Sequence, residues 1–412
     1  MLVFLSYKAS MSDALETIYL AAKADPTCDA IWIPVPYFDV NPDDSLGDMH
    51  YEGQEFYGED VVCTDWREYD LAEHRPDAIF TFAPYDEFNR VTRVHADFFC
   101  SRLRELTKAL VYIPYFVVGD PNVEEHFCLL PGCVYANLVI LQSETVAQRY
   151  RAVFGQEYGD SWGPVSEKFQ AFGSPKLDRM LSLSADDFST PDEWCEHLGE
   201  TSVVLFNTGI DGLLRGNIEH LRKILLVIAK FEERADTVLW WRPHPLSQQT
   251  LASMLPDFAA VYGEVVDFAK RAHWVIYDDS ADLHRAIAWS DAYYGDWSSV
   301  LMLFLGSGKP MMIADDAEIV GALGDESSPR PLGQRFAMNP AMMRELTGCL
   351  YRESPDRSLE AFADYVKSQR SDPLQTEMDM RARRVNVFKE MNTYSDGYAG
   401  EAIYLHMRRL LG

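Results

Sequence analysis

One stretch of the sequence combines residue types that bind phosphate with the pattern that starts a helix. Residues 290–310 read SDAYYGDWSSVLMLFLGSGKP. An apolar segment ends at Tyr294, a glycine turn follows, and Ser298 and Ser299 stand where a buried helix should begin. The unbonded amides of a first helical turn, the positive end of its dipole and two hydroxyls suit an anion. The same pattern is also typical of a core helix capped by Asp296 or Ser298, so both interpretations stay open.

A second stretch, residues 237–246 with the sequence TVLWWRPHPL, places two reactive side chains beyond an apolar run. Arg242 and His244 follow that run, and the neighbouring prolines restrict the backbone that carries them. An immobilised Arg suits bidentate binding of phosphate, and His can exchange a proton near neutral pH. The alternative is an Arg–carboxylate pair beside a structural histidine.

A third stretch is the glycine-bearing loop at 207–212, NTGIDG, between an apolar run and a helical pattern. Asn207, Thr208 and Gly209 form a possible anion cradle, although the spacing is not that of a Walker or dinucleotide motif. Ligands of open parallel sheets collect outside the carboxyl ends of the strands. We therefore expect the three loops to converge on one site.

The elements that must hold these loops alternate between apolar runs of strand length and helical patterns. Because β-then-α order favours a parallel sheet, we predict an α/β protein with two doubly wound domains. We expect an N-terminal domain over 1–181, a linker over 182–200, a second domain over 201–385 and a C-terminal helix within 386–412. The long acidic segment 41–57, which contains His50 and Tyr51, is predicted as a loop that is either functional or a surface excursion. Helices are predicted at 13–24, 65–74, 342–350, 359–369, 375–391 and 401–411.

Composition narrows the function classes. The chain has 412 residues, 47% of them hydrophobic, and a formal net charge of −27. This charge argues against a nucleic-acid binder or an anchor on anionic lipid. The seven cysteines lack the spacing of a metal set, so we expect free thiols in a reducing cytoplasm. We expect neither a signal peptide at the N-terminus nor a membrane span, since no apolar run reaches the roughly 18 residues that a span needs.

These motifs resemble the CDP-glycerol glycerophosphotransferase family, whose members build teichoic-acid-type polymers. The R-P-H-P-L segment and the stretch at 290–310 look like that family's donor half, with Trp297 in place of the usual Tyr. The segment 173–178, GSPKLD, resembles the end of the family's first domain, and Asp396-Gly397 resembles a motif before its last helix. The matching residues of the 290–310 stretch are Asp291, Asp296, Ser298, Ser299, Val300, Phe304, Lys309 and Pro310.

The resemblance implies a GT-B architecture, in which two Rossmann-like domains face a cleft and the last helix crosses back. It implies transfer of a glycerol-phosphate-like unit from a CDP-activated donor to an acceptor hydroxyl, with release of CMP. The acceptor would be a polyol phosphate or glycan, free or lipid-linked. We expect no cofactor, no obligatory metal and no nucleic acid, and a cytoplasmic protein with at most peripheral contact at the inner membrane face.

The resemblance also implies site residues. His244 and Arg242 would be catalytic. The family's first-domain catalytic His is absent here, because the predicted strand at 109–118 is followed by Gly119 and Asp120; Asp120 is the candidate replacement and His126 the alternative. The donor-binding set would comprise Asn207, Thr208, Gly209, Asp296, Trp297, Ser298, Ser299, Gly173 and Lys176.

Two other functions fit the same residues. A GT-B sugar transferase would use the same cradle for a nucleotide-sugar donor. A relative that binds nucleotide or polymer without turnover would explain the missing first-domain His.

Overall fold

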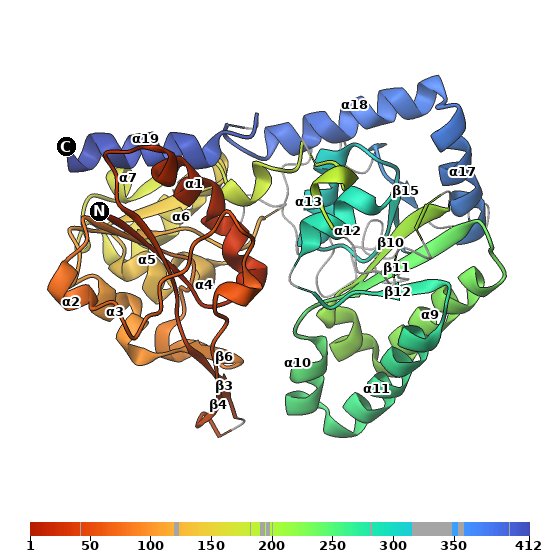
Figure 1. Ribbon diagram of the computed structural model, residues 1–412, viewed down its shortest axis with the longest axis horizontal. Coiled ribbons are helices and arrows are strands. Elements are labelled where there is room, and N and C mark those ends of the chain that lie inside the picture. Colours follow the sequence, from red (N-terminus) through yellow and green to blue (C-terminus); the bar gives the residue numbers. More distant parts are fainter. Residues whose placement is uncertain are drawn as a thin grey trace. The chain divides into compact units, whose positions relative to one another are not determined.

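The computed structural model describes residues 1–41, 43–118, 123–181, 183–189, 194, 198–199, 201–280, 282–314, 348–352, 358–394 and 396–412. The chain forms two compact units, each built on a six-stranded parallel sheet (Figure 1). The first unit comprises Met1–Leu181 and Lys389–Gly412, and the second comprises Ser182–Phe388.

The sheet of the first unit has the order β2-β1-β5-β7-β8-β9. The chain builds outward from β1 in one direction to β2 and in the other direction from β5 onward, so the order reverses between β1 and β5. That reversal is the usual ligand position in a doubly wound sheet. The strands are β1 Leu2–Ser6, β2 Ala30–Pro34, β5 Ala78–Thr81, β7 Ala109–Tyr112, β8 Leu138–Leu141 and β9 Phe169–Ala171.

The longer helices of this unit are α1 (Glu16–Ala24), α6 (Glu144–Tyr158) and α19 (Ala399–Leu411). Although α19 is the last element of the chain, it packs along α1 (Figure 1). Short helices and 3₁₀ turns fill the connections: η1 Ala9–Ala14, η2 Gln54–Phe56, α2 Leu71–His74, η3 Asp86–Phe88, η4 Ala96–Phe98, α3 Cys100–Leu103, α4 Glu125–Cys128, α5 Pro131–Tyr135, α7 Val165–Lys168 and η5 Pro175–Leu177.

A small antiparallel sheet corrects the predicted loop at 41–57. Its order is β4-β3-β6, from β3 (Tyr37–Val40), β4 (Leu46–His50) and β6 (Thr92–Val94). The sequence of β4, LGDMH, lacks the alternation of apolar and polar residues that indicates a strand, and none of its residues is fully buried. It is a strand because it pairs with β3.

The helix predicted at 65–74 is also shorter than expected. Only α2 is helical, because the Asp70 carboxylate caps its start by accepting from the amides of Ala72 and Glu73. At its end, Arg75 takes a left-handed conformation with φ of 43°. These two local features leave a single helical turn.

The sheet of the second unit has the order β12-β11-β10-β13-β14-β15, which reverses between β10 and β13. Two neighbouring inner strands, β10 and β11, are buried along their whole length, as near-continuous apolar sequence predicts for a sheet covered on both faces. The strands are β10 Ser202–Thr208, β11 Thr237–Pro243, β12 Val275–Tyr277, β13 Ala292–Gly295, β14 Met311–Ile313 and β15 Tyr351–Arg352.

Helices α9 to α11 and α17 pack around this sheet, and α18 leads back toward the C-terminus. The predicted helix at 342–350 lies largely outside the described residues. None of the described helices is long and apolar enough to cross a membrane. The helices, with two 3₁₀ turns of the same unit, are η6 Ala185–Asp187, α9 Ile210–Glu232, α10 Ser247–Met254, α11 Pro256–Arg271, α12 Leu283–Trp289, α13 Ser299–Phe304, η7 Leu305–Ser307, α17 Leu359–Ser371 and α18 Gln375–Glu390.

Candidate functional site

The structure brings together the three loops that follow β10, β11 and β13 at the carboxyl edge of the second sheet. The buried Asn207 side chain joins all three. Its Oδ1 accepts from the Ser298 hydroxyl at 2.8 Å, and its Nδ2 donates to the Arg242 carbonyl at 3.0 Å. The His244 amide donates to the Thr208 carbonyl at 2.9 Å. Asn207 and Thr208 therefore hold the loops in register.

The glycine turn after β13 is required by how closely two strands approach. Gly295 has φ of 156°, and a Cβ there would overlap the carbonyl oxygen of Asn207 on β10. The following amide, of Asp296, donates to that same carbonyl at 3.0 Å. Its carboxylate Oδ2 accepts from the Gly209 amide at 2.7 Å and so joins the start of α9 to the turn.

Ser298 is the N-cap of α13, as one of the two interpretations expected. Its Oγ accepts from the Leu301 amide at 3.4 Å while donating to Asn207. The Tyr293 hydroxyl, on β13, donates to the Asp296 carbonyl at 2.5 Å and so holds the turn against the strand that precedes it. Ser299 is exposed at the first turn of α13, and Trp297 is half-buried beside it. The hydroxyl that remains accessible to a ligand is that of Ser299.

Arg242 takes the alternative role that the sequence left open. Its guanidinium is buried, donating from one terminal nitrogen to Asp278 Oδ2 at 2.6 Å and from the other to the Ser280 carbonyl at 2.6 Å. The Asp278 side chain is fully buried and accepts as well from the Trp240 indole at 2.9 Å. Arg242 thus ties the ends of β11 and β12 together.

His244 is half-buried at the end of β11. Its Nδ1 accepts from the Leu246 amide at 3.2 Å, so the neutral ring carries its proton on Nε2. The ring is held by the backbone and not by Arg242.

Sequence reasoning missed His220, which lies on the buried face of α9. Its Nε2 is 3.6 Å from Asp296 Oδ2, and its ring packs so closely on Gly212 that a Cβ there would overlap it. The sequence could have predicted that His220 is buried. It follows the buried Leu213 by seven residues, about two helical turns, so both side chains lie on the same face of α9.

Gly173 and Lys176 lie in the first unit, and they bind parts of that unit. The Lys176 ammonium contacts both carboxylate oxygens of Asp13, at 2.6 and 2.5 Å, and both side chains are largely buried. Gly173 has φ of 83°, and a Cβ there would overlap the Thr393 carbonyl. Within the first unit both residues hold neighbouring segments together, and their donor-binding role stays a prediction.

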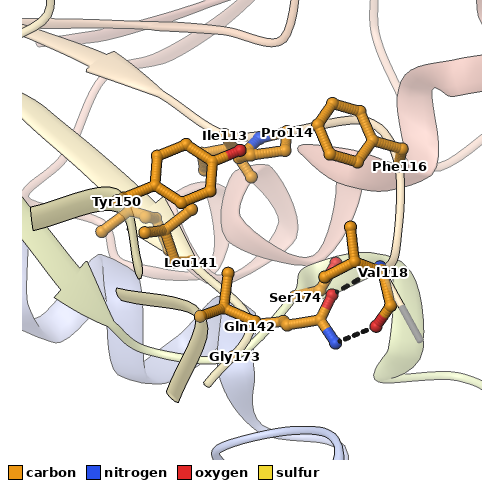
Figure 2. Close-up of a pocket in the computed structure, with 11 residues that line it drawn as sticks. Ile113, Pro114, Phe116, Val118, Leu141, Gln142, Tyr150, Gly173 and Ser174 are labelled. Atoms are coloured by element: carbon orange, nitrogen blue, oxygen red, sulfur yellow. Dashed lines mark hydrogen bonds between the residues drawn. The ribbon is translucent and has the colours of Figure 1, made fainter. Parts of the chain in front are cut away.

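A small pocket lies at the ends of β7 and β8 in the first unit. Figure 2 shows the Gln142 amide facing the backbone of Val118, with which it forms two hydrogen bonds of 2.8 Å. Most of the described residues that line the pocket are apolar, and none is His, Asp or Glu. Of the two candidate bases, His126 on α4 is not among the described residues that line the pocket and contacts Glu124 at 3.3 Å, and Asp120 lies outside the described residues.

Comparison with known proteins identifies the fold. No protein-family model matches the chain, and no curated protein matches its sequence. Among solved structures, the wall teichoic acid polymerase TagF matches over 100% of this chain and 89% of its own, with a TM-score of 0.58 and 16% identity. A TagF structure described as soaked with CDPG matches with a TM-score of 0.57 and 17% identity, over the same shares of the two chains.

Nucleotide-sugar epimerases share this fold as well. MnaA of S. aureus, in a structure with UDP, matches over 100% of this chain and 96% of its own, with a TM-score of 0.54 and 11% identity. A putative UDP-N-acetylglucosamine 2-epimerase from Listeria monocytogenes matches over 99% and 96%, with a TM-score of 0.52 and 12% identity. The chain has a GT-B-type fold.

Proposed function

We propose that this protein is a transferase that moves a glycerol-phosphate-like unit from CDP-glycerol, or a related CDP-alcohol, to an acceptor hydroxyl. One observation carries the proposal: the polar carboxyl edge of the second sheet, in a chain whose whole length has the fold of TagF. The TagF structure soaked with CDPG supports a CDP-alcohol as the donor.

In this proposal the donor diphosphate binds at the start of α9 and beside α13. The amides from Ile210 onward open a helix of 23 residues, whose dipole favours an anion. The Ser299 hydroxyl would donate to the phosphate oxygens, with His244 at the same edge, while Asp296 and Asn207 hold the loops. The acceptor oxygen attacks the phosphorus that carries glycerol, and CMP leaves. Positioning and charge stabilisation supply most of the catalysis of such transfers.

Release of CMP from CDP-glycerol tests the proposal. Gly209 has φ of −80°, so alanine can adopt its backbone, and the added methyl would face Asp296 Oδ2 at 3.5 Å. We expect Gly209→Ala to slow CMP release by about tenfold or more, because the methyl stands at the helix start where the diphosphate binds. The matched control is Gly263→Ala on α11, where a Cβ contacts nothing within 4 Å.

Wild-type protein without CMP release across polyol, polyol-phosphate and glycan acceptors would refute the CDP-alcohol transfer. Equal rates of CMP release in the two alanine variants would show that the diphosphate does not bind at the start of α9.

The likeness to MnaA with UDP favours a second candidate, a GT-B enzyme that uses a nucleotide-sugar donor. A thermal-shift panel separates the two. Stabilisation by UDP-sugars and not by CDP-alcohols would favour the second candidate.

A further inference from the structure

Two buried hydroxyl groups line the pocket at the ends of β7 and β8, those of Tyr150 on α6 and of Ser174 after β9. The two residues are only 1% and 5% exposed. Among the described residues, neither the Tyr150 Oη nor the Ser174 Oγ has a hydrogen-bond partner. Because a buried hydroxyl without a partner costs free energy, both groups are poised to bond a molecule that enters the pocket.

The remaining side chains of the described wall offer apolar surface and no open polar group. Gln142 is bonded at both ends of its amide. Its Oε1 accepts from the Val118 amide at 2.8 Å, and its Nε2 donates to the carbonyls of Val118 and Met391, at 2.8 and 3.0 Å (Figure 2). The ring of Phe116 and the isopropyl group of Val146 are among the apolar groups that line the pocket.

This combination determines the class of ligand. None of the described residues that line the pocket is charged, so a phosphate or carboxylate would lose its hydration without gaining an ionic partner. A polyol has more hydroxyls than Tyr150 and Ser174 can bond, so neither it nor a polyol phosphate suits this wall. An uncharged molecule with one oxygen and a short alkyl group can accept from a hydroxyl and pack on Phe116 and Val146.

The wall of the pocket also holds the segment by which the chain returns to the first unit. The Thr393 amide donates to the Gln142 carbonyl at 2.7 Å, and the Ser174 amide donates to Asn392 Oδ1 at 2.8 Å. Gln142 and Ser174 therefore line the pocket and anchor residues 391–393 at the same time. A molecule that packs against these two residues restrains both anchors.

We propose that this pocket binds an uncharged alcohol or amide with a short alkyl group, and that binding stabilises the segment 391–393. The ligand oxygen accepts a hydrogen bond from Tyr150 or Ser174, and the alkyl group packs on the apolar wall. This ligand is distinct from the donor and from the acceptor of the proposed function, so the site does not depend on that function.

Binding is measured by methyl NMR of the full chain labelled at isoleucine, with isobutanol as the probe and isobutyrate as the anionic comparison. Ile113 and Ile140 line the pocket, whereas Ile276 is buried on β12 of the second unit. Substituting each of the three with valine assigns its signal. We expect isobutanol to shift the Ile113 and Ile140 signals saturably and to leave Ile276 unchanged, and isobutyrate to shift none of them.

Two variants test the hydroxyls. Because neither group has a hydrogen bond to a described residue that it would lose, Tyr150→Phe and Ser174→Ala should both fold. The variant that removes the donating hydroxyl should weaken isobutanol binding about three- to tenfold. The matched control is Tyr112→Phe on β7. It removes another buried hydroxyl without a described partner, from a residue that is not among those lining the pocket, and should leave binding unchanged.

Stabilisation of 391–393 is measured by hydrogen exchange of the wild-type chain. A ligand that binds only when the segment is closed lowers its open population, and isobutanol at about ten times its dissociation constant should slow exchange there about tenfold. Exchange in β10 and β11 of the second unit should not change.

The absence of a saturable shift at Ile113 and Ile140 would refute the site. Equal shifts with isobutyrate would overturn the uncharged class of ligand. Full affinity in both Tyr150→Phe and Ser174→Ala, or an equal loss in Tyr112→Phe, would show that the two hydroxyls do not bond the ligand. Unchanged exchange at 391–393 in saturated protein would refute the effect on the returning segment.

Discussion

Single residues in the second unit divide into those that hold the site and those that can meet a ligand. Asn207 and Arg242 are buried and fully engaged with their neighbours. Ser299 and His244 remain accessible at the same edge. Residue type alone did not separate these groups, because Arg242 and His244 are two positions apart and equally suited to phosphate.

Replacing Arg242 tests its structural role. Arg242→Met leaves the Asp278 carboxylate buried without its partner, so we expect the free energy of unfolding to fall by about 3–5 kcal/mol. Urea unfolding followed by tryptophan fluorescence measures this. Arg222→Met, which removes an exposed pair with Glu219, should cost less than about 1 kcal/mol.

An Arg242→Met protein that unfolds like wild type but no longer binds CDP would contradict this expectation. It would show that the Arg242 guanidinium binds the donor.

At the level of elements, helix starts and strand ends decide what each unit can bind. The hydroxyl of Ser298 starts α13, and the Asp282 carboxylate starts α12 by accepting from the Arg285 amide at 3.0 Å. In the first unit, Asp86 caps α3, accepting from the amides of Cys100 and Ser101 at 2.7 and 3.2 Å. Such caps fix where a helix begins and so where its free amides point.

The Asp86 cap makes stability depend on pH. Burial raises the pKa of its carboxyl from 3.8 to about 6, although the two amides favour the charged form. The folded state therefore binds more protons than the unfolded state between these values. We expect the free energy of unfolding of wild type, relative to Asp86→Asn, to fall by about 2–3 kcal/mol as pH rises from about 4 to about 7.

Urea unfolding across that pH range measures the difference. Asparagine tolerates the positive φ of 46° at this position, so the variant should fold. Asp48→Asn, at an exposed position on β4, should show no such trend. A difference independent of pH would show that the Asp86 carboxyl stays charged throughout.

For the whole molecule, the chain returns to its first unit after building the second. Asp178 holds that return: its carboxylate accepts from the amides of Ala399 and Gly400, at 2.9 and 2.8 Å, and from the Thr17 hydroxyl at 2.7 Å. Gly400 lets α19 approach α1, because a Cβ there would overlap Thr17. The motif at 173–178 thus anchors the C-terminal helix.

We expect Asp178→Ala to loosen α19, since two amides at its start lose their acceptor. Hydrogen exchange should accelerate at 399–411 and change little in β10 or β11. Asp186→Ala, at an exposed position in η6, is the control. Unchanged exchange at 399–411 would show that packing on α1 alone holds the helix.

Local sequence was sufficient to predict the α/β class, the strands β10, β11 and β13 of the second unit and the helix start at Ser298, but not the strand β15. Apolar runs, glycine turns and capping residues act over a few neighbours, so each can be recognised where it stands. The strand β4 escaped prediction because it depends on pairing with β3, not on its own pattern.

The roles of the charged side chains depended on partners that only folding brings into contact. Arg242 meets Asp278 at a separation of 36 residues, Lys176 meets Asp13 at 163, and His50 meets Asp39 across a hairpin. An ion pair forms between groups that are close in space, and the separation of two residues along the chain does not give their distance in the fold. Arg242 and Lys176, whose charges suggested a phosphate site, therefore each form an ion pair that the sequence did not reveal.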